Sequence, residues 1–293
     1  MFSRMRSCSL VSHPGRKGFS LVELLVVIGI IALLAGLRLP SLARGKRAAE
    51  TVVCLNNLKQ FACAWHLYAD EYEETIAPNY STSVPQIYPH AAPAWVMGMM
   101  NCSMDDLPDN TNTLFLTTSL LAPYLGRSIP VWRCPGDHSK SIHSGGTYPR
   151  VRSYSMNFHV NSGFYANQDS WIGDGTIRTR RFIVRRMSDF IAPARTFIFL
   201  DERLDSITDC ASYFDLGPSG PCGTGFIPAD YHNQAGNLVF EDGHAERHRW
   251  LDARTMPPIR DHQFTGLAWP DLPPNRDFPW LKEHAQAFAV DVW

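Results

Sequence analysis

The densest group of metal-binding and acid–base side chains lies near the C-terminus, in the segment YHNQAGNLVFEDGHAERHRW, residues 231–250. Imidazole and carboxylate groups are ligands for zinc, manganese and related divalent cations. One hypothesis is therefore a metal-binding enzyme that uses His232, Asp242, His244 and His248. The competing interpretation is a solvated strand face with charge-complementary cross-strand pairs, in which His232 bonds a backbone group. No Ser/His/Asp spacing, phosphate loop or HExxH motif accompanies these residues.

Asp242-Gly243 between two extended runs predicts a β-hairpin over residues 232–250 with a two-residue type I′ turn. Such a turn pairs three residues on each strand: Glu241 with His244, Val239 with Glu246, and Asn237 with His248. Because side chains alternate along a strand, the polar members of these pairs share one face. Leu238 and Phe240 are expected on the other face, towards the core.

Three further polar stretches have the composition of ligand sites. The loop at residues 102–112 is rich in oxygen atoms, which suits a hard cation, although it matches no EF-hand and a solvated turn is the alternative. Its carboxylate and amide residues are Asp105, Asp106, Asp109, Asn110 and Asn112. The acidic residues Asp201, Glu202, Asp205 and Asp209 follow an expected strand and line either a cleft or a polar edge. The basic run at residues 178–186 favours a half-exposed strand over a DNA contact.

The chain has seven cysteines, and six of them lie beyond the basic N-terminal residues that contain Cys8. An even number is compatible with an oxidising compartment. Cys210 and Cys222 bracket a loop rich in Gly and Pro, so we expect a disulfide between them. Cys54 and Cys63 lie on an expected helix at a spacing that puts them on opposite faces, beyond disulfide reach of each other.

These residues belong to a chain of 293 residues that is 45% hydrophobic and 19% charged, which is enough for a folded core. The net charge is −1. It becomes −5 once the four positive charges of the first 18 residues are removed. A body with that charge has no global basic field for nucleic acid.

Residues 19–39 are apolar except for Ser20, Glu23 and Arg38. As a helix they span about 31 Å, which matches a hydrocarbon core of about 30 Å. The residues that follow fit a signal-peptide cleavage site poorly, so we expect a transmembrane helix. Basic residues on both sides leave its orientation undecided. Glu23 is costly at this depth, because an ionised carboxylate in hydrocarbon costs about 2.5–3.5 kcal/mol.

The order Gly18-Phe19-Ser20-Leu21-Val22-Glu23, after a basic leader at residues 1–18, resembles the class III signal of type IV prepilins and type II secretion pseudopilins. The resemblance implies that a prepilin peptidase cuts between Gly18 and Phe19 and methylates the new N-terminus at Phe19. It also provides a partner for Glu23, because its carboxylate can pair with the Phe19 ammonium of a neighbouring subunit and so favour assembly. An ordinary uncleaved signal anchor is the alternative.

Blocks further along the chain resemble a branch of prepilin-like proteins of planctomycete and verrucomicrobial bacteria that carries an H-X9-DG motif. The motif is His232, nine residues, and Asp242-Gly243. The other blocks are CLNNLKQ at residues 54–60, WRCPGD at 132–137, SYSMN at 153–157 and FLDE at 199–202. The resemblance implies a fibre-type subunit in which the motif is structural. Because Cys54 and Cys134 both lie in these blocks, a disulfide between them is a second expectation.

The apolar pattern predicts one helix from residue 19 to residue 74, with a kink at Pro40. Beyond Pro40, an apolar stripe at steps of three and four residues is suited to packing on a globular head. The stripe consists of Leu55, Leu58, Ala62, Trp65, Ala69 and Tyr72.

The head, residues 75–293, changes to short segments separated by Pro, Gly and Asn. A short helix is expected at residues 114–125, and strands at residues 129–133, 152–156, 182–184, 196–200 and 236–241. A long helix followed by strands predicts an α+β, pilin-like fold, in which the half-transmembrane N-terminal helix packs on an antiparallel β-sheet head.

Together these patterns predict a prepilin-like (pseudopilin) subunit of a type II secretion or type IV pilus-like filament, not an enzyme. Its expected partners are the prepilin peptidase, other pilin or pseudopilin subunits and the bacterial inner membrane, with no nucleic acid. We expect a cytoplasmic N-terminus, a periplasmic continuation of the helix at residues 40–74 and a periplasmic head. No cofactor is expected, and a divalent cation is left open. The alternatives are a membrane-anchored metal-binding enzyme and a DNA- or glycan-binding adhesin on the same anchor.

Overall fold

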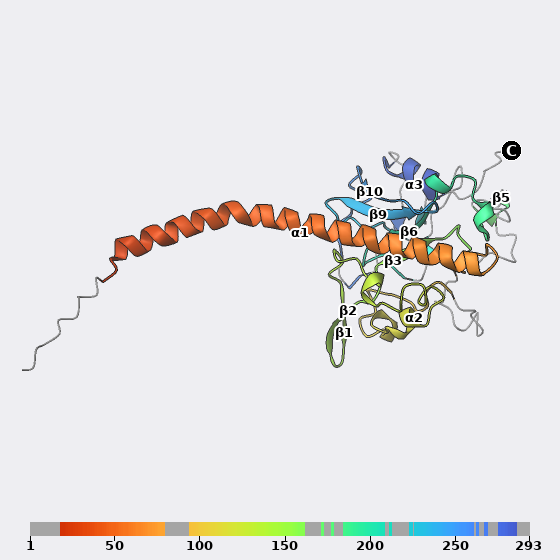
Figure 1. The fold of residues 1–293 in the computed structure, drawn as a ribbon, viewed down its shortest axis with the longest axis horizontal. Coiled ribbons are helices and arrows are strands. Elements are labelled where there is room, and N and C mark those ends of the chain that lie inside the picture. The colour runs from red at the N-terminus through yellow and green to blue at the C-terminus, as the bar shows by residue number, and fades with distance from the viewer. Residues whose placement is uncertain are drawn as a thin grey trace, which may run out of the picture. The chain divides into compact units, whose positions relative to one another are not determined.

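The computed structural model describes residues 18–79, 94–161, 184–208, 226–260 and 275–285, with short pieces at 171–172, 177–178, 211–212, 223–224, 262–263 and 267–268. The chain divides into two compact units, Met1–Lys46 and Arg47–Trp293. Helix α1, Leu21–Glu71, contributes residues to both, and the strands and the remaining helices belong to the second unit (Figure 1).

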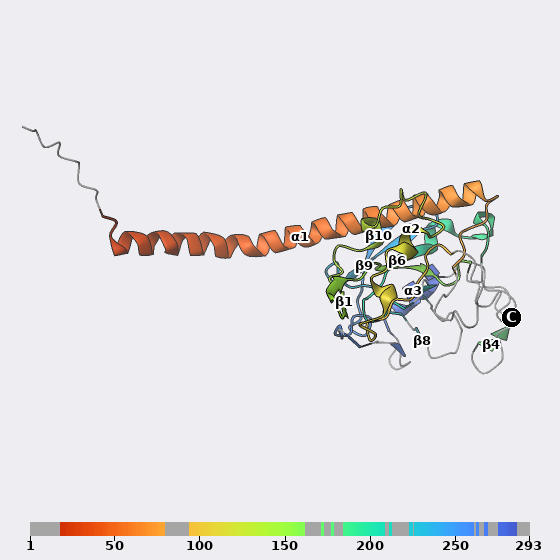
Figure 2. The same ribbon diagram turned by 90° about the horizontal axis from the view of Figure 1, so that it is seen from below.

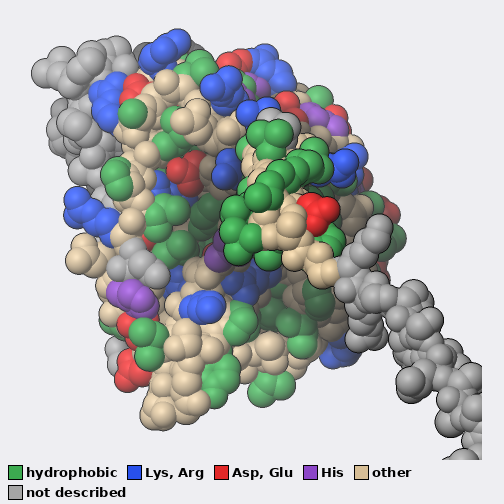
Figure 3. All heavy atoms as spheres, turned by 90° about the vertical axis from the view of Figure 1, so that its left-hand side faces the viewer, with side chains coloured by type: hydrophobic (Ala, Val, Ile, Leu, Met, Phe, Trp, Pro, Cys, Tyr) green, Lys and Arg blue, Asp and Glu red, His purple; other side chains and the backbone are tan. Residues whose placement is uncertain are grey.

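The first part of α1 is apolar on all sides. Most of its large hydrophobic side chains, such as Leu24, Val26, Ile30 and Leu33, are more than half exposed. Hydrophobic side chains surround the end of the helix that faces the viewer in Figure 3. A helix with this pattern is suited to a membrane. Among the described residues, α1 is the helix that is long and apolar enough, by length and composition, to cross one.

The helix continues through Pro40, so the proline removes one backbone hydrogen bond without ending it. The kink expected there stays a prediction. α1 ends at Glu71, three residues before the predicted end. Glu73 and Glu74 take positive φ values of 53° and 63°. The Glu74 backbone N–H donates to the Ala69 carbonyl at 2.9 Å, which satisfies an acceptor of the last helical turn.

The second part of α1 buries one face against the head (Figure 2). Four residues of the predicted stripe are buried: Leu58, Ala62, Trp65 and Ala69. The prediction is wrong at both ends of the stripe, because Leu55 is only half-buried and Tyr72 is 48% exposed. Phe61 and Tyr68 are buried instead. The buried face is therefore wider than one stripe at steps of three and four, as is usual for a helix packed on a globular core.

Within the described residues, the head is built on a five-stranded sheet of order β10-β9-β6-β3-β7. Its strands are β3 (Tyr154–Asn157), β6 (Phe197–Asp201), β7 (Ala211–Ser212), β9 (Ala235–Phe240) and β10 (Ala245–Arg249). Neighbours are antiparallel, except that β7 runs parallel to β3 at one edge. The predicted α+β class is confirmed, and three predicted strands match β3, β6 and β9 within two residues.

Both faces of this sheet are covered. Phe199 and Val239 pack with residues of α1 in one hydrophobic cluster. Leu238 and Phe240 pack in a second cluster with Leu281 of α3 (Phe278–Ala285). The sheet lies between the two helices, as Figures 1 and 2 show. Every residue of β9 is therefore buried, because successive side chains point to opposite faces and each face has a helix on it.

The remaining described elements are short. The paired strands are β1 (Lys140–His143) with β2 (Gly146–Pro149), β4 (Trp171–Ile172) with β5 (Ile177–Arg178), and β8 (Gly223–Thr224) with β11 (Leu267–Ala268). The short helices are η1 (Pro108–Asn110), α2 (Leu114–Thr117), η2 (Pro130–Trp132), η4 (Met187–Asp189) and η5 (Pro193–Arg195).

Two of the predicted segments in the head differ from these elements. The strand predicted at residues 129–133 is wrong, because this segment forms η2, and Pro130 at its start favours a first helical turn. The helix predicted at residues 114–125 is shorter in the structure, where α2 covers Leu114–Thr117. Of the strand predicted at residues 182–184, only Val184 is described, and it forms an isolated bridge with Val160.

Phe61 of α1 supplies a test of the packing between helix and head. Its ring is fully buried against the aromatic rings of Trp132 and Phe199, with centroids 4.9 and 5.4 Å away. We expect Phe61→Ala to lower the free energy of unfolding by about 3–5 kcal/mol. The control is Leu67→Ala on the exposed side of the same helix, which should change it by about 0.5 kcal/mol or less. Urea unfolding of the detergent-extracted chain, followed by tryptophan fluorescence, measures both; equal effects would contradict this packing.

Candidate functional site

The hairpin of β9 and β10 forms where it was predicted, but in a different register. Val239 pairs with Ala245 and Asn237 pairs with Arg247, which is one residue away from the predicted pairing. Side chains of β10 on the predicted polar face, such as that of His248, therefore lie beside Gly236 of β9 and not beside Asn237. A shift of one residue changes which strand faces meet, since side chains alternate.

The turn explains the shift. The Gly243 N–H donates to the Phe240 carbonyl at 3.0 Å, and Gly243 has a φ of +85°. A type I′ turn would require a positive φ at Asp242 as well, and Asp242 is not among the described residues with positive φ. The loop is therefore a type I turn followed by a left-handed glycine, one residue longer than predicted.

His244 and His248 share one face of β10, as predicted, but this face packs on aromatic rings. The His244 ring stacks on Phe240 with centroids 4.2 Å apart, and the His248 ring stacks on Trp280 of α3 at 3.6 Å. Burial lowers the pKa of His248 to about 4, so this ring is neutral near pH 7. His244 Nδ1 lies 2.5 Å from Asp242 Oδ1. Both histidines thus stack on aromatic rings, His248 on one of α3 and His244 on one of β9.

The grouping proposed for a metal site in the hairpin is therefore wrong. Within the part of the chain that the structure describes, no group with metal-ligand spacing contains His244, His248 or Asp242. His232 does belong to such a group, together with residues that are far from the hairpin in the sequence.

The acidic residues after β6 are interior residues and not a polar edge. Asp201, Glu202 and Asp205 are fully buried. Asp205 forms an ion pair with the buried Arg203 at 2.8 Å. Asp209 lies outside the described residues.

The loop at residues 102–112 uses its polar groups to hold the backbone that leads into it. Asp109 Oδ2 accepts the Met99 N–H at 3.0 Å, and Asn110 Oδ1 accepts the Asn101 N–H at 2.8 Å. Within the described residues, this loop contributes to no group of His, Cys, Asp and Glu with metal-ligand spacing. The expected Cys210–Cys222 disulfide, and residues 179–183 of the basic run, lie outside the described residues.

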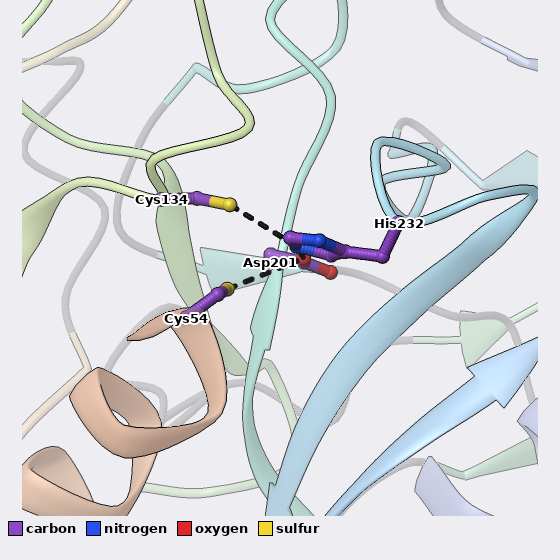
Figure 4. A group of neighbouring side chains, drawn as sticks. All are labelled: Cys54, Cys134, Asp201 and His232. Carbon is purple, nitrogen blue, oxygen red and sulfur yellow. Dashed lines mark hydrogen bonds and ion pairs between the residues drawn. The ribbon is translucent and has the colours of Figure 1, made fainter. Parts of the chain in front are cut away.

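One cluster of buried side chains has the chemistry and spacing of a metal centre: Cys54, Cys134, Asp201 and His232 (Figure 4). One ligand atom from each lies within 4.8 Å of the others. Cys134 Sγ is 3.2 Å from His232 Nε2, and Cys54 Sγ is 3.6 Å from Asp201 Oδ2. His232 Nε2 lies 3.1 Å from Asp201 Oδ2. We call these four residues the Cys–Asp–His centre.

Four separate segments bring these side chains together. Cys54 lies on the buried side of α1, whereas Cys63 is exposed, as the helical spacing predicted. Cys134 follows η2, and Asp201 is the last residue of β6. His232 lies in the turn before β9. The disulfide expected between Cys54 and Cys134 is wrong, since both cysteines are free although their sulfurs are neighbours.

Residues around the centre hold its side chains in place. The Tyr154 hydroxyl donates to Cys54 Sγ at 3.4 Å. The Asn237 N–H donates to Asp201 Oδ1 at 2.8 Å, which leaves Oδ2 facing the centre. Gly236 is needed for this approach, because a Cβ at that position would lie 3.1 Å from Asp201 Oδ1 and 2.8 Å from the Ala229 carbonyl oxygen.

Burial and mutual hydrogen bonds shift the pKa values of side chains in the centre. Burial raises the pKa of the Cys134 thiol well above its usual range, and its hydrogen bond with Cys54 raises it further. Burial acts the same way on Cys54, but hydrogen bonds with Cys134 and His232 outweigh it and lower the pKa of Cys54. Burial acts to lower the pKa of His232, but the hydrogen bond with Asp201 raises it to about 10. The pKa of Cys54 and the pKa of His232 therefore shift in opposite directions, and both shifts favour the charged forms.

The sequence indicated each member of the centre but not the group. His232, Cys54, Cys134 and Asp201 each lie in a different block of the H-X9-DG resemblance. Their presence in these blocks was the signal in the sequence that could have pointed to the four residues. No spacing rule joins these residues, because Cys54 and Asp201 are 147 positions apart and Cys134 and His232 are 98 apart.

The start of α1 has a second notable arrangement. The Ser20 N–H donates to Glu23 Oε2 at 2.9 Å, and the Glu23 N–H donates to Ser20 Oγ at 3.2 Å. This reciprocal pair is a capping box, which satisfies two backbone donors at the helix start. Gly18 and Phe19 precede it, and both are exposed.

Comparison with known proteins identifies the N-terminal part of the chain. The prokaryotic N-terminal methylation motif matches residues 14–37. The chain is also similar to the type IV wide pilus major component PilA4 of Thermus thermophilus, with 46% identity over 59 residues. That match spans 19% of this chain and 45% of the pilin. No solved structure matches the chain.

An apolar N-terminal helix that continues into an α+β head is the architecture of pilins and related subunits. Together with the methylation motif and the pilin similarity, it supports a type IV prepilin/pseudopilin-like protein.

The glycine of the hairpin turn provides a test of the observed register. No atom lies within 4 Å of a Cβ built on Gly243, so substitution there adds backbone strain without a clash. We expect Gly243→Ala to lower the free energy of unfolding by about 1 kcal/mol, and Gly243→Asn to lower it less, because Asn tolerates positive φ. Urea unfolding of the detergent-extracted chain measures both. If Ala and Asn are equally harmless, Gly243 does not hold the left-handed conformation.

Proposed function

We propose that this protein is a structural subunit of an inner-membrane filament of the type II secretion or type IV pilus class. The methylation motif matched at residues 14–37 carries the proposal, since the match includes Gly18, Phe19 and Glu23, which lie next to the start of an apolar helix. The similarity to a pilus major component supports a role in assembly. The same class is generally structural and non-enzymatic, which supports a role without catalysis.

Processing is the first step of the proposal. A prepilin peptidase cuts after Gly18, removes the basic leader at residues 1–18 and methylates the amine of Phe19. Residues 19–39 then span the inner membrane once, with the N-terminus on the cytoplasmic side. Residues 40–74 continue the helix into the periplasm, and residues 75–293 form the periplasmic head. The exposure of Gly18 and Phe19, ahead of the first helical turn, supports access by the peptidase.

Assembly follows from the charge at Glu23. Cleavage creates a positive amine at Phe19, and a neighbouring subunit provides the carboxylate of Glu23. A lone charge in hydrocarbon is costly, and pairing it with an opposite charge recovers much of that cost. Pairing of this kind favours stacked helices in one axial register. The partners of the filament are therefore further copies of this chain or related pilin subunits.

The capping box allows the charge of Glu23 to be tested separately from its role in the helix. We expect Glu23→Gln to abolish filament formation, because glutamine at this position still caps the helix but carries no charge. Ser20→Ala is the matched control: it removes the capping hydroxyl, keeps the carboxylate and should still assemble. The readouts are filaments recovered by shearing and ultracentrifugation, and membrane insertion by fractionation. Normal filaments from Glu23→Gln would refute the pairing.

Cleavage and methylation by the peptidase can be measured separately from assembly. We expect the intact mass of the membrane-extracted protein to correspond to a chain that begins at Phe19 and carries one added methyl group. A Gly18→Val variant should keep its leader, because a branched side chain then replaces the small residue before the proposed cut. A mature protein that begins at Met1 would favour the uncleaved signal anchor.

A further inference from the structure

We propose that the Cys–Asp–His centre binds one zinc ion, which fastens α1 to the head. The inference stands on Cys54, Cys134, Asp201 and His232 alone and does not depend on the proposed filament. It concerns a site different from the hairpin face that the sequence suggested for a metal.

The spacing of the ligand atoms fits a tetrahedral zinc ion. Zinc lies about 2.3 Å from thiolate sulfur and about 2.0 Å from imidazole nitrogen or carboxylate oxygen, so its ligands are about 3.3–3.8 Å apart. Three of the observed separations are 3.1, 3.2 and 3.6 Å, and all are within 4.8 Å. The side chains come from four segments and converge on one point in Figure 4, so small rotations are enough to complete the tetrahedron.

The donor set selects the metal. Two thiolates, one imidazole and one carboxylate suit zinc, whereas magnesium and calcium prefer sites made of oxygen atoms. All four side chains are at most 1% exposed. A closed site with four protein ligands is typical of structural zinc, because catalytic zinc keeps one position open for water or substrate. The two cysteines bind as thiolates and His232 binds through a deprotonated Nε2, so the protons on these three side-chain atoms pass to solvent when zinc enters.

The surrounding hydrogen bonds orient His232 as a metal ligand. The Thr51 hydroxyl donates its one proton to the Arg47 carbonyl at 2.8 Å. Its contact of 3.2 Å with His232 Nδ1 must therefore be accepted from an Nδ1–H. This leaves Nε2, which faces Cys134 and Asp201, as the nitrogen that binds the metal. Orientation of a histidine ligand by a partner on its other nitrogen is usual in zinc sites.

The neighbours also suit the charge of the occupied site. Zinc with two thiolates, a carboxylate and a neutral imidazole carries a net charge of −1. The Tyr154 hydroxyl donates to Cys54 Sγ, and the Asn237 N–H donates to Asp201 Oδ1. Both donors lie where negative charge remains, which is how polar neighbours stabilise metal-bound thiolate and carboxylate.

The position of the centre indicates what the zinc does. Cys54 is its ligand on α1, and the other ligands belong to the loop after η2, to β6 and to the turn before β9. One ion thus cross-links the helix to three segments that are far apart in the sequence. Such a cross-link stabilises the folded state, because binding occurs only when all four segments are in place. It holds the head on a helix that anchors the chain.

Metal content tests the proposal directly. The full chain is extracted from membranes in detergent under reducing conditions, given Zn²⁺ and dialysed against a weak chelator. Mass spectrometry of the metals should find about one zinc per chain. We expect Cys134→Ser and His232→Ala to lower the zinc content at least about tenfold. Cys63→Ser, an exposed cysteine on the same helix, and His244→Ala in the hairpin are the matched controls and should keep the full content.

A second measurement covers ligand variants that fail to fold. The wild-type chain is loaded with Co²⁺, and a thiolate-to-cobalt charge-transfer band together with tetrahedral ligand-field absorption is expected. Absence of bound zinc and of the cobalt band in the folded wild-type chain would overturn the proposal. So would zinc content that is equal in Cys134→Ser, His232→Ala and wild type. A Cys54–Cys134 disulfide in protein isolated from cells without added reductant would also overturn it.

Discussion

Phe61 of α1 is buried among aromatic rings that come from several segments of the head, including Trp95, Trp132 and Phe199. Burial of rings of this size is among the largest apolar contributions available to a domain. The sheet exposes a hydrophobic face that α1 covers, while α3 covers the opposite face. The helix that begins in the apolar N-terminal segment is therefore also one wall of the core, and the fold of the head depends on it.

Charged and polar groups lie next to this apolar core, where isolated charges would be costly. Arg203 and Asp205 pair with each other at 2.8 Å. Asp201 uses one oxygen for the Asn237 N–H and turns the other towards Cys54 and His232. The Cys–Asp–His centre is thus part of a buried polar layer between α1 and the sheet. A metal ion there would neutralise charge that the interior otherwise stabilises by hydrogen bonds alone.

Glu23 illustrates how one residue can satisfy local and intermolecular demands. Within the chain its carboxylate accepts the Ser20 N–H, which needs an acceptor whether or not subunits assemble. In the proposed filament the same carboxylate also faces a neighbouring Phe19 amine. Only the second role requires a negative charge, because an uncharged amide also caps a helix. Local capping therefore accounts for the residue's position, and the proposed assembly would account for its ionisable group.

Local signals in the sequence were enough for the N-terminal helix, the α+β class and the positions of β3, β6 and β9. Hydrophobic periodicity and turn residues are properties of neighbouring positions, so they can be read without knowing the fold. Asp242-Gly243 marked the hairpin turn, yet a loop one residue longer changed its register. The polar face expected on β10 became a stacking surface because α3, which follows about thirty positions later, packs on it.

The Cys–Asp–His centre could not be assembled in this way. Each ligand lies alone in its segment, and 147 positions separate Cys54 from Asp201. Their meeting depends on how α1 crosses the sheet and on the turn that brings His232 back to β6. These arrangements are decided by packing between distant segments, which leaves no periodic trace in the sequence. Residue types alone therefore indicated the separate ligands, and only the tertiary structure joined them into one site.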